Sequence, residues 1–447
     1  MNSQSKKMEL LGSAPLPKAL LAMGIPTMIG MLVNAFYNLA DAFFVGGLGE
    51  SQMGAVSVVY PLGQVVAGLG LLFGNGAASC LSRLLGCGDR ENADKVASTA
   101  LYSSVSVGAV IIVIFMAFLQ PVIRLLGATD SILPYAITYA GIYIASCIFN
   151  VFNVTMNNIV TSEGAAKTTM CALLTGAILN IALDPLLIYG VGLGVAGAAV
   201  ATAISQAVST CVYLIYILRK KSAFHFRVRD CTYAGQTMSE ILKIGIPTLT
   251  FQILTSVSIS LINNAAGDYG DSAIAGMGVV TRLISMISLS VFGFIKGFQP
   301  IAGYSYGAKK ADRLREAIRT SILWSTAFCV FFGVILALFP TAVVSRFTGD
   351  VEMIRIGAAA LRANGFSVMF FGFYTVYSSL LLALGKGKEG FFLGACRQGI
   401  CFIPVILFLP IVWGLNGIVY AQPIADVLSA VITVCMAVPL HRKLNEI

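Results

Sequence analysis

The sequence predicts an all-α, polytopic membrane protein whose twelve transmembrane helices form two six-helix lobes related by internal duplication. Composition is the first reason, because 57% of the 447 residues are hydrophobic and only 11% are charged, compared with about 25% charged residues in ordinary soluble domains. The second reason is the number of long apolar stretches, and the third is a repeat at half the chain length. Together these observations exclude a water-soluble protein.

Twelve apolar stretches are long enough to cross a membrane, since a helix needs roughly 20 residues to span a hydrocarbon core about 30 Å thick. The predicted spans cover residues 17–47, 53–84, 94–120, 131–156, 167–189, 194–218, 240–268, 274–305, 315–340, 354–382, 389–411 and 414–440. The first stretch is longer than the apolar core of a cleavable signal peptide and lacks a small-residue cleavage site, so we expect it to remain in place.

The second half of the chain repeats the first half at a nearly constant offset of 221 residues. The repeat pairs Gly24 with Gly245, Pro26 with Pro247, Gly46 with Gly267, Gly76 with Gly297 and Gly86 with Gly307. Because each half contains an even number of spans, both halves enter the membrane in the same direction, and we expect a pseudo-twofold axis along the membrane normal. Two such lobes around a central cavity are a common design of secondary transporters.

Basic residues orient the predicted bundle, because loops rich in Lys and Arg stay in the cytoplasm. Of the 29 basic residues, 23 fall on one side, Arg397 among them, and the others are Arg124, Arg282, Lys296, Arg346, Arg355 and Arg362. We therefore expect a multi-pass protein of the cell inner membrane with both termini in the cytoplasm. Its predicted parts are an N-terminal lobe (1–218), a cytoplasmic linker (219–239) and a C-terminal lobe (240–447). The net charge of +9 follows from this orientation and from contact with anionic lipid, so no nucleic-acid partner is expected.

Polar residues on the first span suggest a cavity, because an ionisable side chain in a span is costly unless it faces a cavity or a partner. Asn34, Tyr37, Asn38 and Asp41 follow one another at the i, i+3, i+4, i+7 spacing of a single helical face. This face is not expected to point at lipid.

The fifth span carries Asn180 and Asp184 one helical turn apart, directly before Pro185. Proline lacks an N–H, so the carbonyl of Ile181 loses its helical partner. The carboxylates of Asp41 and Asp184 would repel each other within one lobe unless a proton or a monovalent cation neutralised them. Oxygen ligands without sulfur or imidazole suit Na⁺ as readily as H⁺. The ten cysteines lie mostly within predicted spans and are interpreted as packing residues, so no other metal site is assigned.

The fourth and sixth spans add polar faces to the same lobe. Tyr139, Asn153 and Asn157 lie on the fourth span, and Thr202 and Gln206 lie on the sixth. Hydrogen bonds between helices would also explain such residues taken singly. The clustering of all four polar faces in the first lobe favours a site there.

Asp426 is a further acidic residue within a span. We expect it to form a structural ion pair with Arg362, Arg282 or Lys296, and we prefer this interpretation over a coupling role. Arg282 and Lys296 lie within the eighth span, where a long basic side chain can snorkel or line the cavity.

A substrate cavity is predicted from polar and aromatic residues of the central spans. Its candidate residues are Gln206, Gln252, Asn364, Phe371 and Tyr374. Aromatic and Met-rich walls suit flat, apolar, cationic molecules through area burial and cation–π contacts. Ordinary packing against spans eleven and twelve explains each aromatic residue equally well.

Three segments resemble the multidrug and toxic compound extrusion (MATE) transporters, in their archaeal and bacterial DinF-like branch. They are NAFYNLADAFFVGGLG in the first span, NIALDPLLIYGVGLGVAGAAVAT from the fifth span onward, and GFQPIAGYSYGAKK at 297–310. The resemblance covers the whole chain. It implies a monomeric antiporter, without an enzymatic activity or a cofactor, that exports organic and mostly cationic compounds by alternating access in exchange for H⁺ or Na⁺.

The resemblance also assigns roles to residues. It implies a cation-coupling site at Asp41, Asn180, Asp184 and Thr202, a supporting hydrogen-bond network at Asn34, Tyr37, Tyr139 and Asn157, and a hinge at Pro26. The family's NorM-like branch instead carries acidic residues on spans seven and ten. Here Gln252 lies in span seven and no carboxylate lies between 362 and 382, so a coupling site of that kind is not expected.

Three other functions share some of these sequence features. A flippase for lipid-linked oligosaccharides would share the two-lobed architecture, but it should place several cationic residues in the cavity, whereas the first lobe here is acidic and rich in amides. An intramembrane aspartyl protease is suggested by two membrane aspartates, but the residues around Asp41 and Asp184 do not match its motifs. A sodium-coupled symporter should show unwound, Gly-rich segments within its spans.

Overall fold

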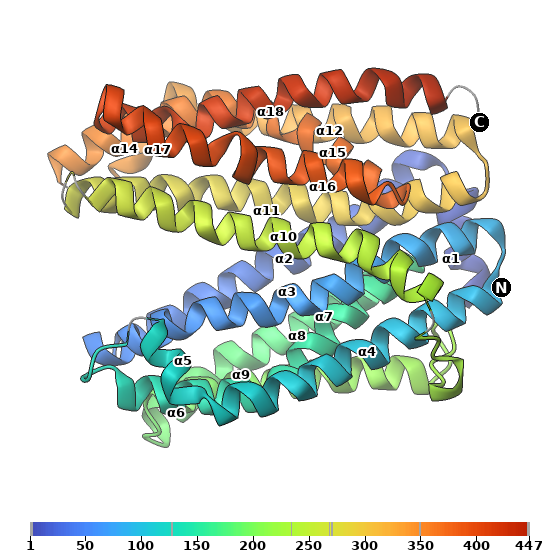
Figure 1. Cartoon of the computed structure of the whole chain (residues 1–447), viewed down its shortest axis with the longest axis horizontal. Helices are drawn as coiled ribbons and strands as arrows, with labels where there is room; N and C mark the ends of the chain where they lie inside the picture. Colours follow the sequence, from blue (N-terminus) through green and yellow to red (C-terminus); the bar gives the residue numbers. More distant parts are fainter. Residues whose placement is uncertain are drawn as a thin grey trace.

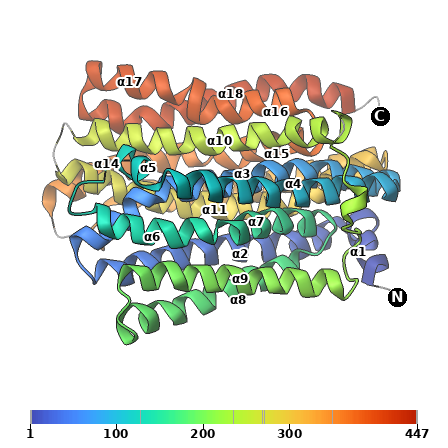
Figure 2. The ribbon, with the colours of Figure 1, turned by 60° about the horizontal axis from the view of Figure 1, so that its bottom comes forward.

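The computed structural model of the chain describes residues 3–126, 128–233, 235–267, 269, 271–347 and 350–444. Within these ranges every regular element is a helix, which confirms the predicted all-α class. The long helices run side by side along the longest axis of the molecule, and both chain ends lie at the same end of the bundle (Figures 1 and 2). We call this end the terminal face and the other end the opposite face.

The first lobe follows a short helix, α1 (Ser3–Gly12). It comprises α2 (Leu16–Gly46), α3 (Glu50–Cys87), α4 (Arg90–Ala117), α5 (Leu119–Leu125), α6 (Leu133–Ala145), α7 (Cys147–Ser162), α8 (Ala166–Pro185), the π-helical turn η1 (Leu186–Gly190) and α9 (Val195–Leu218).

The second lobe follows a connection that contains the 3₁₀ turn η2 (Val228–Asp230). It comprises α10 (Gly235–Gly267), α11 (Asp271–Gly307), α12 (Ala311–Leu338), α13 (Pro340–Val344), α14 (Val351–Val368), α15 (Phe371–Ala383), α16 (Gly387–Ala395), the π-helical turn η3 (Cys396–Ile400), α17 (Phe402–Trp413) and α18 (Leu415–Leu444). The first turn of α10 lies within the segment 219–239 that was predicted as a linker.

The number of spans agrees with the prediction of twelve. In the described part of the chain, ten helices are long and apolar enough to cross a membrane, and two bent helix pairs bring the number to as many as twelve. The bent pairs are α6 with α7, at 48°, and α14 with α15, at 50°. They are the fourth span of each lobe, so the bend belongs to the repeated unit.

Most of the duplicated glycines lie where the two lobes touch; Gly46 is an exception, because an added Cβ there meets nothing within 4 Å. A Cβ atom added at Gly297 of α11 would lie 2.5 Å from the backbone nitrogen of Gly24 in α2, and one added at Gly245 of α10 would lie 2.0 Å from the carbonyl oxygen of Leu72 in α3. The repeat relates α2 to α10 and α3 to α11, so the two contacts join equivalent pairs of helices. Small residues let helix backbones approach this closely in membrane proteins, so the repeated glycines are explained by the contact between the lobes.

Side-chain hydrogen bonds between the lobes are concentrated toward the terminal face. They join Thr27 Oγ1 to the carbonyl of Gly293 (2.6 Å), Asn75 Nδ2 to Thr248 Oγ1 (2.8 Å), Ser79 Oγ to the carbonyl of Leu382 (2.5 Å) and the Arg83 guanidinium to Glu240 (3.3 Å). Farther along the same helices, Gln252 Nε2 donates to Gln64 Oε1 at 2.7 Å. The ribbons of the two lobes diverge toward the opposite face (Figure 1).

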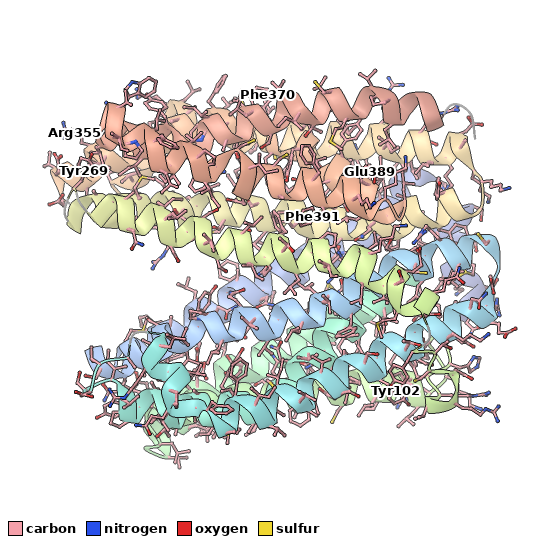
Figure 3. The ribbon with its side chains drawn as sticks, in the orientation of Figure 1. Tyr102, Tyr269, Arg355, Phe370, Glu389 and Phe391 are labelled. Carbon is pink, nitrogen blue, oxygen red and sulfur yellow. The ribbon has the colours of Figure 1, made fainter. Side chains whose placement is uncertain are left out.

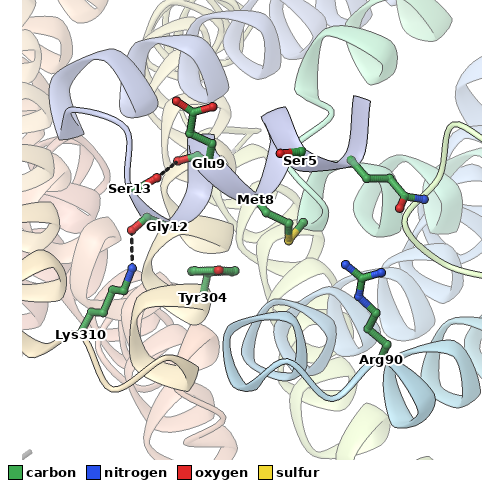
Figure 4. Close-up of a pocket in the computed structure, with 9 residues that line it drawn as sticks. Ser5, Met8, Glu9, Gly12, Ser13, Arg90, Tyr304 and Lys310 are labelled. Carbon is green, nitrogen blue, oxygen red and sulfur yellow. Dashed lines mark hydrogen bonds between the residues drawn. The ribbon is translucent and has the colours of Figure 1, made fainter. Parts of the chain in front are cut away.

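Helix α1 is bonded to both lobes at the terminal face. Lys7 donates to the fully buried Glu163 at the end of α7 (3.1 Å). Arg313 of α12 donates to carbonyls in the last turn of α1, at Leu10 (3.3 Å) and Leu11 (3.1 Å), and to that of Ala14 (2.7 Å) in the following connection. Figure 4 shows the pocket of about 610 Å³ beside α1, where Lys310 donates to the carbonyl of Gly12. We call α1 with these contacts the N-terminal strap.

Candidate functional site

A small polar cavity lies inside the first lobe between α2, α7, α8 and α9. Five residues predicted for the coupling site, its supporting network or the substrate cavity line it together: Asn34, Tyr37, Asn180, Thr202 and Gln206. Its volume is about 50 Å³, enough for a small ion or a water molecule. Drug-sized molecules need pockets of roughly 300–1,000 Å³, so this cavity in its present form suits an ion and excludes a drug.

Asn180 lines this cavity and contacts two other predicted coupling residues. Its Nδ2 faces both Asp184 Oδ1 and Thr202 Oγ1, each at 3.4 Å. Asn180 and Asp184 are 1% and 0% exposed. Positions 180 and 184 lie one turn apart on α8, so the amide and the carboxylate face the same side of the helix.

Several oxygens at this site have no hydrogen-bond partner. Among the described residues, Asp41 Oδ1, Asn180 Oδ1 and Asp184 Oδ2 are buried and unpaired. Buried polar atoms normally find a partner, because leaving one unpaired costs about 1–3 kcal/mol. Three unpaired acceptors from two neighbouring helices therefore suit the binding of a cation or a proton. Carboxylate, amide and hydroxyl oxygens are the ligands expected for Na⁺ rather than for a transition metal.

Asp41 and two tyrosines extend the site toward α6. The charges of Asp41 and Asp184 interact, and both also act on the hydroxyls of Tyr37 and Tyr139. Tyr139 is buried and stacks on Tyr143, with the ring centroids 6.1 Å apart and the planes 11° from parallel. The structure thus brings together residues of α2, α6, α8 and α9 that the sequence placed on four separate polar faces.

Asn157 connects the first lobe to the second. Its Nδ2 donates to the hydroxyl of Tyr213, which also lines the cavity, at 3.1 Å. Its Oδ1 accepts a short hydrogen bond from the ammonium of Lys296 on α11. Sequence reasoning found both Asn157 and Lys296 as polar residues within spans but did not pair them.

Pro26 lies within α2, which runs unbroken from Leu16 to Gly46. Pro26 is buried, and the neighbouring Thr27 bonds to α11. The missing N–H of a proline removes one helical hydrogen bond, which makes this the weakest point of α2. Its role as a hinge stays a prediction.

The residues predicted for the substrate cavity are not gathered in one place. Gln252 bonds to Gln64 at the contact between the lobes. Asn364, Phe371 and Tyr374 are 5%, 2% and 4% exposed inside the second lobe. Tyr374 donates to the carbonyl of Leu393 at 2.8 Å, a contact between helices of that lobe. Only Gln206 among the five lines the first-lobe cavity as far as the structure is described.

Asp426 forms the predicted ion pair, but the predicted partners were wrong. Its partner is Arg397, whose Nε donates to Asp426 Oδ1 at 2.7 Å, and the two side chains are only 8% and 5% exposed. Arg397, assigned above to the cytoplasmic side, lies instead in η3 within the eleventh span, and its guanidinium stacks 4.6 Å from the ring of Phe371. A carboxylate and an aromatic face compensate its burial.

Comparisons with known proteins agree with this architecture. A sequence model of the MatE family matches residues 26–186 and 230–408. The multidrug export protein MepA of Staphylococcus aureus (strain MSSA476) is 29% identical over 435 residues, which are 97% of this chain and 96% of MepA. A crystal structure of MATE in the straight conformation superposes with a TM-score of 0.93 at 27% identity over 99% of each chain. One of MATE in the bent conformation gives a TM-score of 0.92 at 26% identity, over 99% of this chain and 98% of the other.

The family match extends over both lobes and over most of the chain, and the structural likeness covers nearly all of it. The three quoted sequence segments thus indicated the right family, and this chain belongs to the MatE family of transporters.

Proposed function

We propose that this protein is a cation-coupled antiporter that exports organic, mostly cationic compounds by alternating access. The observation that carries the proposal is the set of buried, unpaired oxygens of Asp41, Asn180 and Asp184, of which Asn180 also lines the cavity of about 50 Å³. The name of MepA as a multidrug export protein supports the substrate class. No enzyme function remains, because the family consists of transporters.

The coupling ion, H⁺ or Na⁺, would be held by four residues. Asp41 and Asp184 would supply the negative charge, and Asn180 would present its unpaired Oδ1. Thr202 would contribute its hydroxyl, which already faces Asn180. Binding of either ion relieves the repulsion between the two carboxylates and gives the unpaired oxygens a partner.

The effect of the ion would be transmitted through α2. Asp41 lies near the C-terminal end of this helix, and Pro26 lies nearer the terminal face. Around Pro26, α2 contacts α11 through Gly24 and Thr27. Neutralising Asp41 would favour a bend at Pro26 and so change the space between the lobes. Coupling requires that the ion and the exported compound stabilise different states. The straight and bent conformations of solved MATE structures are consistent with two such states.

We place the terminal face in the cytoplasm, with the two lobes at 1–218 and 240–447 and the linker at 219–239. Most basic residues support this orientation. Arg355, one of the few basic residues expected elsewhere, lies at the opposite face (Figure 3). Because the bonds between the lobes are concentrated toward the terminal face, the structure then represents a state closed toward the cytoplasm. A monomer suffices for this mechanism, since both lobes belong to one chain.

The exported compound would bind between the lobes rather than in the first-lobe cavity. That cavity is too small for it, and among the predicted residues Gln252 lies at the contact between the lobes. Asn364, Phe371 and Tyr374 would need a rearrangement of the second lobe to reach it, because they are buried. A flippase of lipid-linked oligosaccharides is not favoured, since MepA, which this chain matches over nearly its full length, is named an export protein.

The test is extrusion of a fluorescent organic cation from proteoliposomes, with H⁺ and Na⁺ gradients imposed separately. We expect one gradient to drive extrusion, and we expect Asp41→Asn and Asp184→Asn to abolish the driven part. Asp130→Asn is a matched control, because the Asp130 side chain is 90% exposed, lies in the loop after α5 and pairs with Arg124. Full gradient-driven extrusion by both site variants would overturn the assignment of the coupling site.

A further inference from the structure

Lys296 is a charged residue that the proposed mechanism leaves unused. It lies on α11 of the second lobe, is partly buried, and donates to Asn157 Oδ1 of the first lobe. Within the described ranges no carboxylate pairs with its ammonium or interacts with it electrostatically. Holding an ammonium in a span without a counter-ion is costly, and such residues usually have a functional role.

Lys296 lies between the proposed coupling site and the terminal face. Asn157 is five residues from the end of α7 at Ser162, and Asn180 is fourteen residues from the start of α8 at Ala166. Both of these helix ends lie at the terminal face. At 1.5 Å per residue, Asn157 is about 8 Å and Asn180 about 21 Å from it. The ammonium of Lys296, bonded to Asn157, therefore lies at a depth between the coupling site and the terminal face, which a cation leaving in that direction has to cross.

The hydrogen bond between Lys296 and Asn157 also depends on whether the two lobes are closed at the terminal face. Lys296 reaches Asn157 across the boundary between α11 and α7, and Asn157 is bonded to Tyr213 of the cavity wall. Separation of the lobes at the terminal face would withdraw the ammonium from Asn157. The positive charge is thus held beside Asn157, on the terminal-face side of the coupling site, only while the lobes are closed there.

We propose that Lys296 is a tethered cation that prevents the coupling ion from crossing to the terminal face while the lobes are closed there. The proposal rests on the proposed antiport function. Its ammonium repels an ion that moves from Asp184 toward Asn157, and it leaves only when the lobes separate. Lys296 is therefore a positioning residue for ion coupling and is not itself a ligand of the transported ion.

The experiment measures leakage of ions in the absence of any exported compound. Proteoliposomes with a trapped pH dye report H⁺ leakage, and radioactive Na⁺ uptake reports Na⁺ leakage. Lys296→Gln keeps a hydrogen-bond donor for Asn157 but removes the charge, whereas Lys296→Arg keeps the charge. We expect leakage on the order of tenfold faster for Lys296→Gln, the effect of one charge about 10 Å from the ion at protein dielectric. We expect Lys296→Arg to leak as slowly as the native chain.

Controls separate this proposal from a merely structural role and from a failure of the antiporter assignment. Lys388→Gln removes an exposed charge of the second lobe and should not change the leakage. Adding Asp41→Asn to Lys296→Gln should suppress the leakage if the ion passes through the coupling site. Should Lys296→Gln leak at the native rate while the native chain still exports, the proposal is wrong and the antiporter stands. A native chain that exports nothing would instead contradict the antiporter assignment.

Discussion

Gly297→Ala is the sharpest test of how the two lobes are held together. Its added Cβ would lie 2.5 Å from the backbone nitrogen of Gly24, about 0.9 Å short of the 3.4 Å at which ordinary contact begins. Both partners are backbone, so no flexible side chain can give way. Overpacking of this kind costs about 1–3 kcal/mol, and the cost applies only to a state in which α2 and α11 touch here.

The expected result is a shift of the population away from the closed terminal face, by roughly 5- to 150-fold for a cost of 1–3 kcal/mol. Pulsed electron–electron double resonance would measure the distance between two spin labels, one at Arg90 and one at Lys388. Both positions are exposed, and they lie on different lobes near the terminal face. The labels are attached to cysteines introduced there in a chain whose native cysteines are replaced. The share of long distances should rise in Gly297→Ala.

Gly278→Ala is the matched control, because Gly278 lies on the same helix and an added Cβ there meets nothing within 4 Å. The reasoning is refuted if both alanine variants give the same distance distribution as the native chain. Loss of folded protein in Gly297→Ala alone would show overpacking without a change of state. The test would then be repeated with Gly307→Ala, farther toward the terminal face. The added Cβ there would lie 2.1 Å from the carbonyl oxygen of Arg83.

Three further predictions concern single contacts. Asp426→Asn should destabilise the second lobe by about 3–5 kcal/mol, because it leaves the buried Arg397 unpaired; unfolding in mixed micelles measures this, and an unchanged midpoint would contradict it. Glu163→Gln removes the ion pair of Lys7, which keeps its hydrogen bonds to Tyr216 and to the carbonyl of Lys221, and should speed hydrogen exchange in α1, whereas unchanged exchange there would show that the ion pair does not hold the strap. Asp89 caps α4, and its hydrogen bonds to the first turn hold the pKa of its carboxyl below the ordinary value. Since a group with a lowered pKa stabilises only while ionised, Asp89→Ala should speed amide exchange in that turn at pH 7 and have no effect once the pH falls below the carboxyl pKa.

The sequence was most informative where apolar surroundings restrict what a polar residue can do. A carboxylate such as Asp184 within a span must face a cavity or a partner, so helical periodicity sufficed to place it beside Asn180. The repeat was equally informative, because glycines at equivalent positions mark backbone contacts between helices. The boundaries of spans were less certain. The fourth span was predicted at 131–156, but α7 continues to Ser162 after a bend that no proline or glycine marks.

Pairing between distant residues could not be predicted from periodicity. Arg397 and Asp426 lie on different helices, and the predicted partners were chosen by their presence in spans, which says nothing about which side chains meet. The bond between Lys296 and Asn157 depends on the relative position of the two lobes, a property of one conformational state rather than of any helix. Contacts of this kind need the three-dimensional arrangement.

The N-terminal strap has a consequence for how the protein is prepared. Helix α1 continues into α2 through residues 13–15 only, so it must travel with the first lobe. Any separation at the terminal face then has to break the bonds from Arg313 and Lys310 to the end of α1. Preparations that differ only in an affinity tag or a truncation within the first dozen residues would therefore differ in the populations of the closed and separated states at the terminal face, although every transmembrane residue is identical.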